Sequence, residues 1–181
     1  MLNSEPKVGY TSRLTNPEDF LYWSHDMKFS EFQVGQILHH PPVVITEAEM
    51  VDFAKKYDPQ WFHTDPEASK AGRWGGVIGS GWLTCSLAMR MAVDAVLHDS
   101  ESFASPGVEK VRWMLPTRPG DALRLEMRVD SVRVSSSRDD LGILRWTWSM
   151  FNQRNEQVLE LEATSLFDLG DSASSQADKK A

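Results

Sequence analysis

Residues 82–97 place the strongest restriction on how this chain folds. The first turns of this stretch, WLTCSLAM, are apolar or small on every side, as expected of a helix that is enclosed by protein. Two apolar stripes run along it, one of Leu83, Leu87 and Met91 and one of Ala88, Ala92 and Ala95. The remaining elements must therefore supply an apolar surface that surrounds this helix.

Four segments after this helix alternate between apolar and polar residues with the period of two that is typical of strands. They cover residues 108–116, 122–134, 142–153 and 156–169. Because short turns separate long amphipathic segments, they predict an antiparallel meander. Trp146, Trp148 and Met150 share one face and are expected to cover the helix, with an aromatic substrate box as the alternative.

A curved antiparallel sheet whose apolar face wraps a single hydrophobic helix is the layered arrangement that these elements allow, an α+β fold. The 181 residues, 41% of them hydrophobic and 25% charged, suffice for one full core and are too few for two large domains. We expect this domain to span residues 27–169. A partly ordered arm with a small aromatic cluster is expected at residues 1–26, and a flexible tail at residues 170–181.

Two further elements are expected before the central helix. A first strand lies within residues 29–46, where two consecutive prolines restrict it to an edge or a bulge of the sheet. The sequence TEAE, which begins at Thr46, has the Ser/Thr-x-x-Glu form of a capping box. Apolar residues follow it at helical spacing, which predicts a helix over residues 46–57.

Charge and cysteine content exclude several classes of function. The net charge of -7 and the absence of a Lys/Arg run argue against a nucleic-acid partner, because phosphate binding needs a basic face. The single cysteine, Cys85, cannot form an internal disulfide, and no stretch reaches the ~18 apolar residues of a membrane span. The first residues, MLNSEPKVGY, lack the apolar core of a signal peptide, so a cytoplasmic protein is expected.

No metal site is expected from the adjacent histidines His39 and His40. Neighbouring side chains on a strand point to opposite faces, so the two imidazoles cannot jointly hold a metal ion. We expect both to be exposed histidines at a sheet edge.

Asp58 and His63 are the candidate catalytic residues. Pro59 disfavours the helical conformation in the residue before it, so Asp58 is presented at the end of a helix, and His63 follows five positions later on an irregular segment. An acid and an imidazole held together can move a proton. Each also has a simpler interpretation, because Asp-Pro commonly opens a turn and a lone histidine commonly packs beneath a loop.

A glycine-rich turn, GGVIGSG at residues 75–81, leads directly into the central helix. The unpaired amides and the dipole at a helix start can hold developing negative charge, which makes Gly79, Ser80 and Gly81 candidate oxyanion or substrate-binding residues. The alternative is that the glycines only permit close packing. Their spacing matches neither the dinucleotide-binding nor the P-loop pattern, so a nucleotide site is not expected.

These residues resemble the MaoC-like dehydratases, relatives of the (R)-specific enoyl-CoA hydratases that have the hotdog fold. The resemblance covers about residues 29–167. It is most specific in YDPQWFHTDP, residues 57–66, which is similar to the family's Asp-x4-His motif, and in the GGVIGSG turn that follows. LPTRPGD at residues 115–121 and NQRNEQV at residues 152–158 also resemble the family, at the strand and turn after the central helix and at the last hairpin.

The resemblance implies that Asp58 and His63 form a catalytic dyad and that the Gly81 amide binds the thioester carbonyl oxygen. It implies a hydro-lyase that reversibly hydrates a trans-2-enoyl thioester of the acyl-CoA type to a 3-hydroxyacyl thioester, with no metal or redox cofactor. A homodimer or a higher homo-oligomer is also implied, because pairing across a two-fold axis removes an aggregation-prone sheet edge.

Some residues depart from the family pattern. Gln60 and Trp61 stand where the family commonly has Asn-Pro, which predicts a different loop shape or acyl pocket. Met89 stands where some hydratases carry a serine, and Ser86, one turn earlier, can replace that serine only if it faces the site. The candidate pocket residues are Trp61, Phe62 and Trp82.

Two other functions stay open at this point. A hotdog thioesterase would use the same helix start but direct water to the thioester carbonyl, and would release free CoA. A catalytically silent acyl-binding module would keep the fold without turnover, although the intact acid and imidazole argue against it. The residues that are candidates for steering the CoA phosphates are Lys70, Arg73, Arg112 and Arg118.

Overall fold

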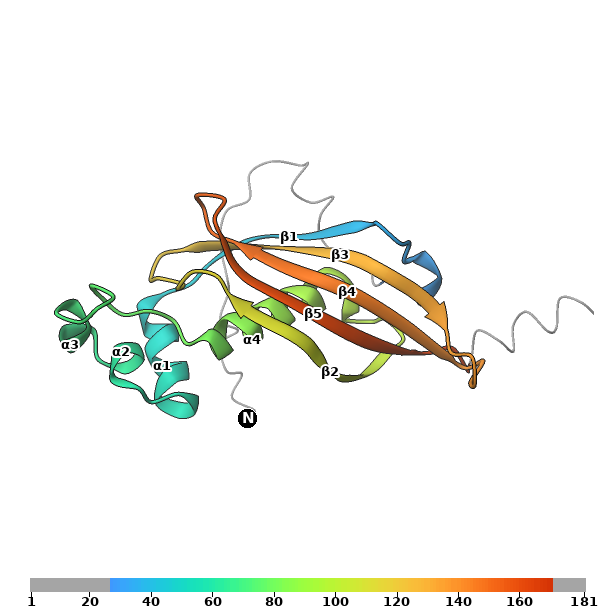
Figure 1. The fold of residues 1–181 in the computed structure, drawn as a ribbon, viewed down its shortest axis with the longest axis horizontal. Helices are drawn as coiled ribbons and strands as arrows, with labels where there is room; N and C mark the ends of the chain where they lie inside the picture. The colour runs from blue at the N-terminus through green and yellow to red at the C-terminus, as the bar shows by residue number, and fades with distance from the viewer. Residues whose placement is uncertain (1–26, 171–181) are drawn as a thin grey trace, which may run out of the picture.

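The computed structural model describes residues 27–170, and its strands form one antiparallel sheet in the order β1-β3-β4-β5-β2 (Figure 1). The strands are β1 (Ile37–Val44), β2 (Ser102–Trp113), β3 (Ala122–Val134), β4 (Leu141–Phe151) and β5 (Gln157–Asp168). The meander predicted for all four alternating segments is confirmed for β3, β4 and β5 but is wrong for β2, which pairs with β5 at the far edge and not with β3. The aromatic cluster of the N-terminal arm and all but the first residue of the tail lie outside the described residues.

The central helix α4 (Gly81–Ala92) continues as a wider π-helical turn, η3 (Val93–Leu97), and lies against one face of the curved sheet (Figure 1). Leu125, Met127 and Met150 point from β3 and β4 into this layer and are 0% exposed. Both apolar stripes of the helix face the sheet side, since Leu83 and Met91 of one and Ala88 of the other are buried. This is the α+β hotdog arrangement expected from the sequence.

The helix is enclosed on one side only, which differs from the expectation. Trp82, Ser86 and Met89 of α4 are exposed. The sequence pattern missed this because two of the three side chains are as apolar as the buried ones.

Strand β2 begins at Ser102, six residues before the predicted start at Val108. Pro106 and Gly107, with φ of 143° at the glycine, interrupt the alternation that sequence reasoning relied on. The chain nevertheless stays paired with β5, and register shifts between Ser102 and Lys110 absorb the irregular residues.

Strand β1 lies at the opposite edge of the sheet and contains a bulge between His40 and Val43, as its two prolines predicted. His39 is exposed as expected, but the expectation for His40 was wrong, because its side chain is only 3% exposed. The two imidazoles do point to opposite faces, and the inner face is here the core. Burial lowers the pKa of His40.

Helices α1 (Glu47–Tyr57), α2 (Trp61–Thr64) and α3 (Pro66–Lys70) lie together at one end of the sheet, and a single 3-10 turn, η2 (Phe29–Glu31), precedes β1 (Figure 1). The predicted capping box is present: the Glu49 amide donates to the Thr46 hydroxyl at 3.2 Å, and the Thr46 amide donates to the Glu49 carboxylate at 2.9 Å. Helix α1 then ends with Asp58 as its C-terminal cap. Pro59 after it disfavours a further helical turn, so Asp58 is presented where the helix ends.

Replacing the α1 cap, Thr46→Ala, is expected to lower the free energy of unfolding by about 1 kcal/mol, because an amide at the helix start loses its acceptor. Thr46→Ser keeps the hydroxyl and is the matched control. Urea unfolding followed by circular dichroism measures both variants. Equal stability of the alanine variant and the wild type would contradict this role for the cap.

Candidate active site

Asp58 and His63 lie side by side, although five positions separate them in the sequence. Between them the chain makes the short helix α2, whose first turn forms as the His63 amide donates to the Gln60 carbonyl at 2.9 Å. This turn carries His63 back toward the end of α1, so that its Nε2 atom lies 3.4 Å from Oδ2 of Asp58. The segment expected to be irregular is therefore partly helical, and the helix creates the pair.

The carboxylate of Asp58 accepts hydrogen bonds from both sides. Oδ1 accepts from Nε2 of Gln60 at 2.8 Å, and Oδ2 accepts from the Ser80 hydroxyl at 2.7 Å. Burial by itself would raise the pKa of Asp58, but these two donors, together with the nearby His63, outweigh it and lower that pKa. Asp58 is thus held as an anion beside the imidazole.

His63 is held in one orientation from its other nitrogen. Its Nδ1 atom lies 2.7 Å from the Ile78 carbonyl oxygen, which can only accept, so Nδ1 carries the proton in this contact. The Nε2 atom is left to face Asp58 and can accept or donate a proton there. The imidazole is only 6% exposed and contacts the ring of Phe62, with 4.4 Å between ring centroids.

The glycine-rich turn brings the start of α4 to this pair. Ser80 is the N-cap of α4, and its hydroxyl accepts from the Trp82 amide at 3.3 Å while it donates to Asp58. The Gly79 amide donates to the Thr117 carbonyl at 2.9 Å, so it is already engaged. The Gly81 amide, at the first helical position, has no acceptor among residues 27–170. Of the three predicted oxyanion residues, Gly79 has an engaged amide, whereas the amides of Ser80 and Gly81 have no acceptor among residues 27–170.

Close packing, the alternative considered for these glycines, also applies. A Cβ atom at Gly79 would lie 2.4 Å from the Thr117 hydroxyl oxygen, and one at Gly81 would lie 2.4 Å from the Trp113 ring. The Trp113 indole also donates from Nε1 to the Gly81 carbonyl at 2.9 Å. Gly81 therefore fits both interpretations. Its lack of a side chain leaves room for Trp113, and its amide has no acceptor among residues 27–170.

Two residues of the site were missed by sequence reasoning. Gln60 appeared only as a departure from the family pattern, yet it supplies one of the donors to Asp58; a side-chain amide two residues after an acid was the available signal. Trp113 reaches Gly81 from the end of β2, and no local pattern indicates this because 32 residues separate them.

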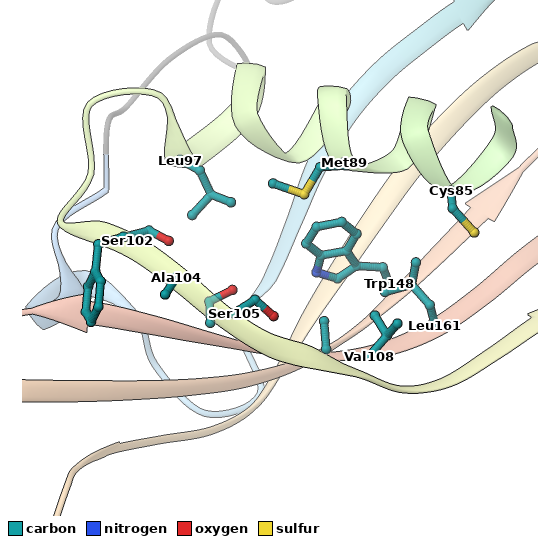
Figure 2. A pocket seen from close by; sticks show the side chains of 12 residues that line it. Cys85, Met89, Leu97, Ser102, Ala104, Ser105, Val108, Trp148 and Leu161 are labelled. Carbon is teal, nitrogen blue, oxygen red and sulfur yellow. The ribbon is translucent and has the colours of Figure 1, made fainter. Parts of the chain in front are cut away.

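The candidate pocket residues lie outside the cavity that the structure has beside α4. Trp61 is 52% exposed and packs over Gly72, and Trp82 is 58% exposed and packs edge-to-face on Trp113. A cavity of about 400 Å³ lies between α4, strand β2 and the sheet, and neither these two nor Phe62 lines it (Figure 2). Its wall includes Cys85 and Met89 of the helix.

The candidate basic residues differ in their surroundings. Lys70 forms an exposed ion pair with Glu67, with 2.6 Å between Nζ and Oε1. Arg118 donates to the Trp74 carbonyl at 2.9 Å, in the loop that precedes the glycine turn. Within residues 27–170 no cluster of three or more His, Cys, Asp or Glu side chains suits a metal ion. In the same part of the chain, every helix is too short or too polar to cross a bilayer.

The chain is similar to one protein family and to several known proteins. The family described as "MaoC like domain" matches residues 31–141, which is more than half of the chain. Protein MaoC of Klebsiella aerogenes is 30% identical over 133 residues, and YdeM of Bacillus subtilis, whose function is uncharacterised, is 28% identical over 140 residues. These matches cover 70% and 77% of this chain, but 39% of protein MaoC and 98% of YdeM.

Three further similar proteins have names that state an activity. The 3-hydroxyacyl-thioester dehydratase Z of Mycobacterium tuberculosis is 34% identical over 84 residues, which are 45% of this chain and 56% of that protein. The crystal structure of the MaoC-like dehydratase from Rhodospirillum rubrum is 32% identical, with a TM-score of 0.71 over 77% of this chain and 94% of that one. The (R)-hydratase from A. caviae shares the fold, with a TM-score of 0.61 over 75% of this chain and 96% of that one at 24% identity.

The stabilisation of the Asp58 carboxylate predicts a dependence of stability on pH. Because its folded pKa is lower than the unfolded value of about 3.9, its contribution is fully present above that value and is lost as the pH falls through the folded pKa. Wild type is therefore expected to exceed Asp58→Asn in unfolding free energy near neutral pH, and the difference is expected to shrink in acid.

Urea unfolding of both proteins at a series of pH values from about 7 to 3 measures this difference. The variant Asp52→Asn, at an exposed carboxylate of α1, controls for the loss of one charge. A difference between wild type and Asp58→Asn that stays constant over the series would contradict the stabilised anion.

Proposed function

The chain belongs to the MaoC-like domain family, and we propose that it is a hydro-lyase that reversibly hydrates a trans-2-enoyl thioester, of the acyl-CoA type, to a 3-hydroxyacyl thioester. The observation that carries this proposal is the 3.4 Å approach of His63 Nε2 to Asp58 Oδ2 beside the start of α4. The names of the relatives support it, because two of those described above are dehydratases.

In the hydration direction Asp58 and His63 act on one water molecule. The anionic Asp58 accepts a hydrogen bond from the water and orients its oxygen toward C3 of the enoyl group. His63 takes the water's other proton on Nε2, because Nδ1 is held by the Ile78 carbonyl. The new O–C3 bond pushes the electrons of the double bond onto the thioester, which forms an enolate. The proton on His63 then passes to C2 and restores the resting state.

The Gly81 amide stabilises the enolate oxygen between these two steps. It lies at the first position of α4, where the helix dipole also favours negative charge. Loss of one such donor typically costs about 3 kcal/mol of transition-state stabilisation. The chemistry needs neither a metal nor a redox cofactor, since the carbonyl of the substrate itself receives the electron pair.

The same helix start would also serve a thioesterase, in which water attacks the thioester carbonyl. The two reactions leave different products: hydration removes the conjugated double bond and keeps the thioester, whereas hydrolysis releases free thiol. The assay must therefore follow both signals at once.

Asp58→Asn and His63→Gln are each expected to keep the fold and to lower kcat by about 10²- to 10⁴-fold, because each removes one partner of the proton transfer. The measurement is the absorbance of crotonyl-CoA and of a longer trans-2-enoyl-CoA, with a thiol reagent in a parallel cuvette. Loss of the conjugated signal without free thiol is the expected wild-type result.

His98→Gln, at an exposed imidazole after η3, is the matched control and should leave the rate unchanged. Full activity in either dyad variant would remove that residue from the mechanism. Thiol release by the wild type would replace the proposed hydratase with a thioesterase, and silence in both cuvettes would favour an acyl-binding module.

We also propose that two copies of the chain pair through strand β2. This strand lies at a sheet edge, and its backbone has one free side there. Phe103, Val108 and Trp113 of β2 are 58%, 52% and 47% exposed, and Trp82 and Met89 of the neighbouring α4 add to this apolar surface. A second copy would cover it. The other edge, β1, is less suited because of its two prolines and its bulge.

Val108→Lys is expected to convert a dimer of this kind into a monomer, because the ammonium group would be buried between two copies. Sedimentation equilibrium measures the mass directly. Val44→Lys, at an equally exposed valine on β1, is the matched control and should leave the mass unchanged. A monomeric wild type, or a dimer that only the β1 variant disrupts, would overturn pairing through β2.

A further inference from the structure

The cavity between α4, strand β2 and the sheet extends along the helix. Cys85 lies at one end of it, and Leu97, the last residue of η3, lies at the other end near Ser102 of β2 (Figure 2). Leu97 comes twelve positions after Cys85, which is roughly 18 Å at a rise of 1.5 Å per residue. A volume of about 400 Å³ spread over such a length is narrow, so it suits one extended chain better than a bulky ring system.

The wall of the cavity changes from apolar to polar along this length. Figure 2 shows Leu161 toward the Cys85 end, and Ser102 and Ser105 toward the Leu97 end. A third serine, Ser165, lies four positions after Leu161 on β5 and also lines the cavity. The polar groups therefore gather at the end that is farther from the start of α4.

Ser165 is a polar residue in an otherwise apolar row of side chains. Every second residue of β5 from 159 to 167 points into the layer between the sheet and the helix and is buried. The other members of this row are Leu159, Leu161, Ala163 and Phe167. A hydroxyl at such a buried position usually has a hydrogen-bond partner.

The Ser165 hydroxyl makes no hydrogen bond to any other group of residues 27–170, although the residue is only 7% exposed. It is nevertheless accessible: the indole nitrogens of Trp146 and Trp148 are sealed even from a water molecule, whereas Oγ of Ser165 is not. Because β5 lies between β4 and β2, the accessible part of this inward side chain faces the cavity. Ser105 differs, since its hydroxyl already donates to the Thr164 carbonyl at 2.7 Å.

The strands place Ser165 far from the proposed reaction centre. Trp113 of β2 donates to the Gly81 carbonyl, and its partner residue on β5 is Leu159. Ser165 follows six positions later on β5, which is roughly 20 Å at 3.3 Å per residue. An oxygen atom that meets Ser165 therefore lies toward the distal end of a long chain and not beside the thioester.

We propose that the acyl chain of the substrate extends from Gly81 along this cavity, and that the Ser165 hydroxyl donates a hydrogen bond to an oxygen near the distal end of that chain. This inference rests on the proposed function for the position of the thioester. The preferred substrates are then long-chain acyl thioesters with a distal hydroxyl, ether or carbonyl oxygen. Ser165 selects this class because a chain of carbon alone displaces water from the hydroxyl without replacing its hydrogen bond.

The test compares acyl thioesters of equal length. In one series an ether oxygen replaces one methylene group at successive positions of a long-chain acyl-CoA, and the parent compound has only carbon in the chain. Saturated members are measured for binding by calorimetry, which requires no turnover. The trans-2-enoyl members are measured for hydration as kcat/KM. For each protein the result is the ratio of oxygen-containing to parent compound at each position.

Ser165→Ala is expected to lower this ratio at the best oxygen position by roughly three- to ten-fold, because it removes one hydrogen bond to the ligand. Ser149→Ala is the matched control. It removes a serine hydroxyl from β4 at a residue next to Trp148, so on the opposite face of the sheet, and should leave the ratio unchanged.

A second variant moves the hydroxyl instead of removing it. Ala163 lines the same cavity two positions before Ser165, so Ala163→Ser combined with Ser165→Ala shifts the hydroxyl by roughly 7 Å toward the thioester. The best oxygen position is expected to shift several methylene groups in the same direction. A general loosening of the core would not produce such a shift, so this variant separates binding from packing.

Three results would overturn the proposal: a wild type that prefers the parent chain at every position, equal ratios in the wild type and Ser165→Ala, or a double variant that keeps the wild-type optimum. Failure of the proposed function has a different signature. A wild type that binds the oxygen-containing compounds preferentially without hydrating any enoyl member would leave Ser165 as the selecting residue of an acyl-binding protein.

Discussion

The hydrogen bond from the Ser80 hydroxyl to Asp58 is the interaction on which the rest of the site depends. The same hydroxyl accepts from the Trp82 amide, so one side chain both caps the central helix and holds the acid. Ser80 is 0% exposed, which makes each of these contacts costly to lose, because neither partner can turn to water. The placement of the carboxylate is therefore tied to the packing of the helix against the sheet.

Most of the fold could be predicted from the sequence, because it follows from local patterns. The alternation of Leu123, Leu125 and Met127 fixes which face of β3 meets the helix, and a shift of one residue would expose all three. The capping box at Thr46 and the proline after Asp58 set the two ends of α1. Such signals act over a few residues and do not depend on the rest of the chain.

The parts that could not be predicted depend on contacts between distant segments. The pairing of Asp58 with His63 was expected, but the engagement of the Gly79 amide by Thr117 and the cover of Gly81 by Trp113 join segments about thirty residues or more apart. The type of side chain does not predict exposure either, because Met89 is as apolar as the core methionines and yet lies at the surface. An apolar side chain is more stable when it is buried, but its hydrophobicity does not show whether the same chain or another molecule buries it.

The contact between His63 and the Ile78 carbonyl has a consequence for motion. Ile78, Ser80 and Gly81 are close neighbours on one short segment, and they respectively hold the imidazole, hold the carboxylate and present the open amide. A displacement of this segment moves all three groups together, so their relative distances change far less than their positions. When the helical layer fluctuates over the sheet, the carboxylate, the imidazole and the amide therefore move as one unit. Their alignment does not require the helical layer to be rigid.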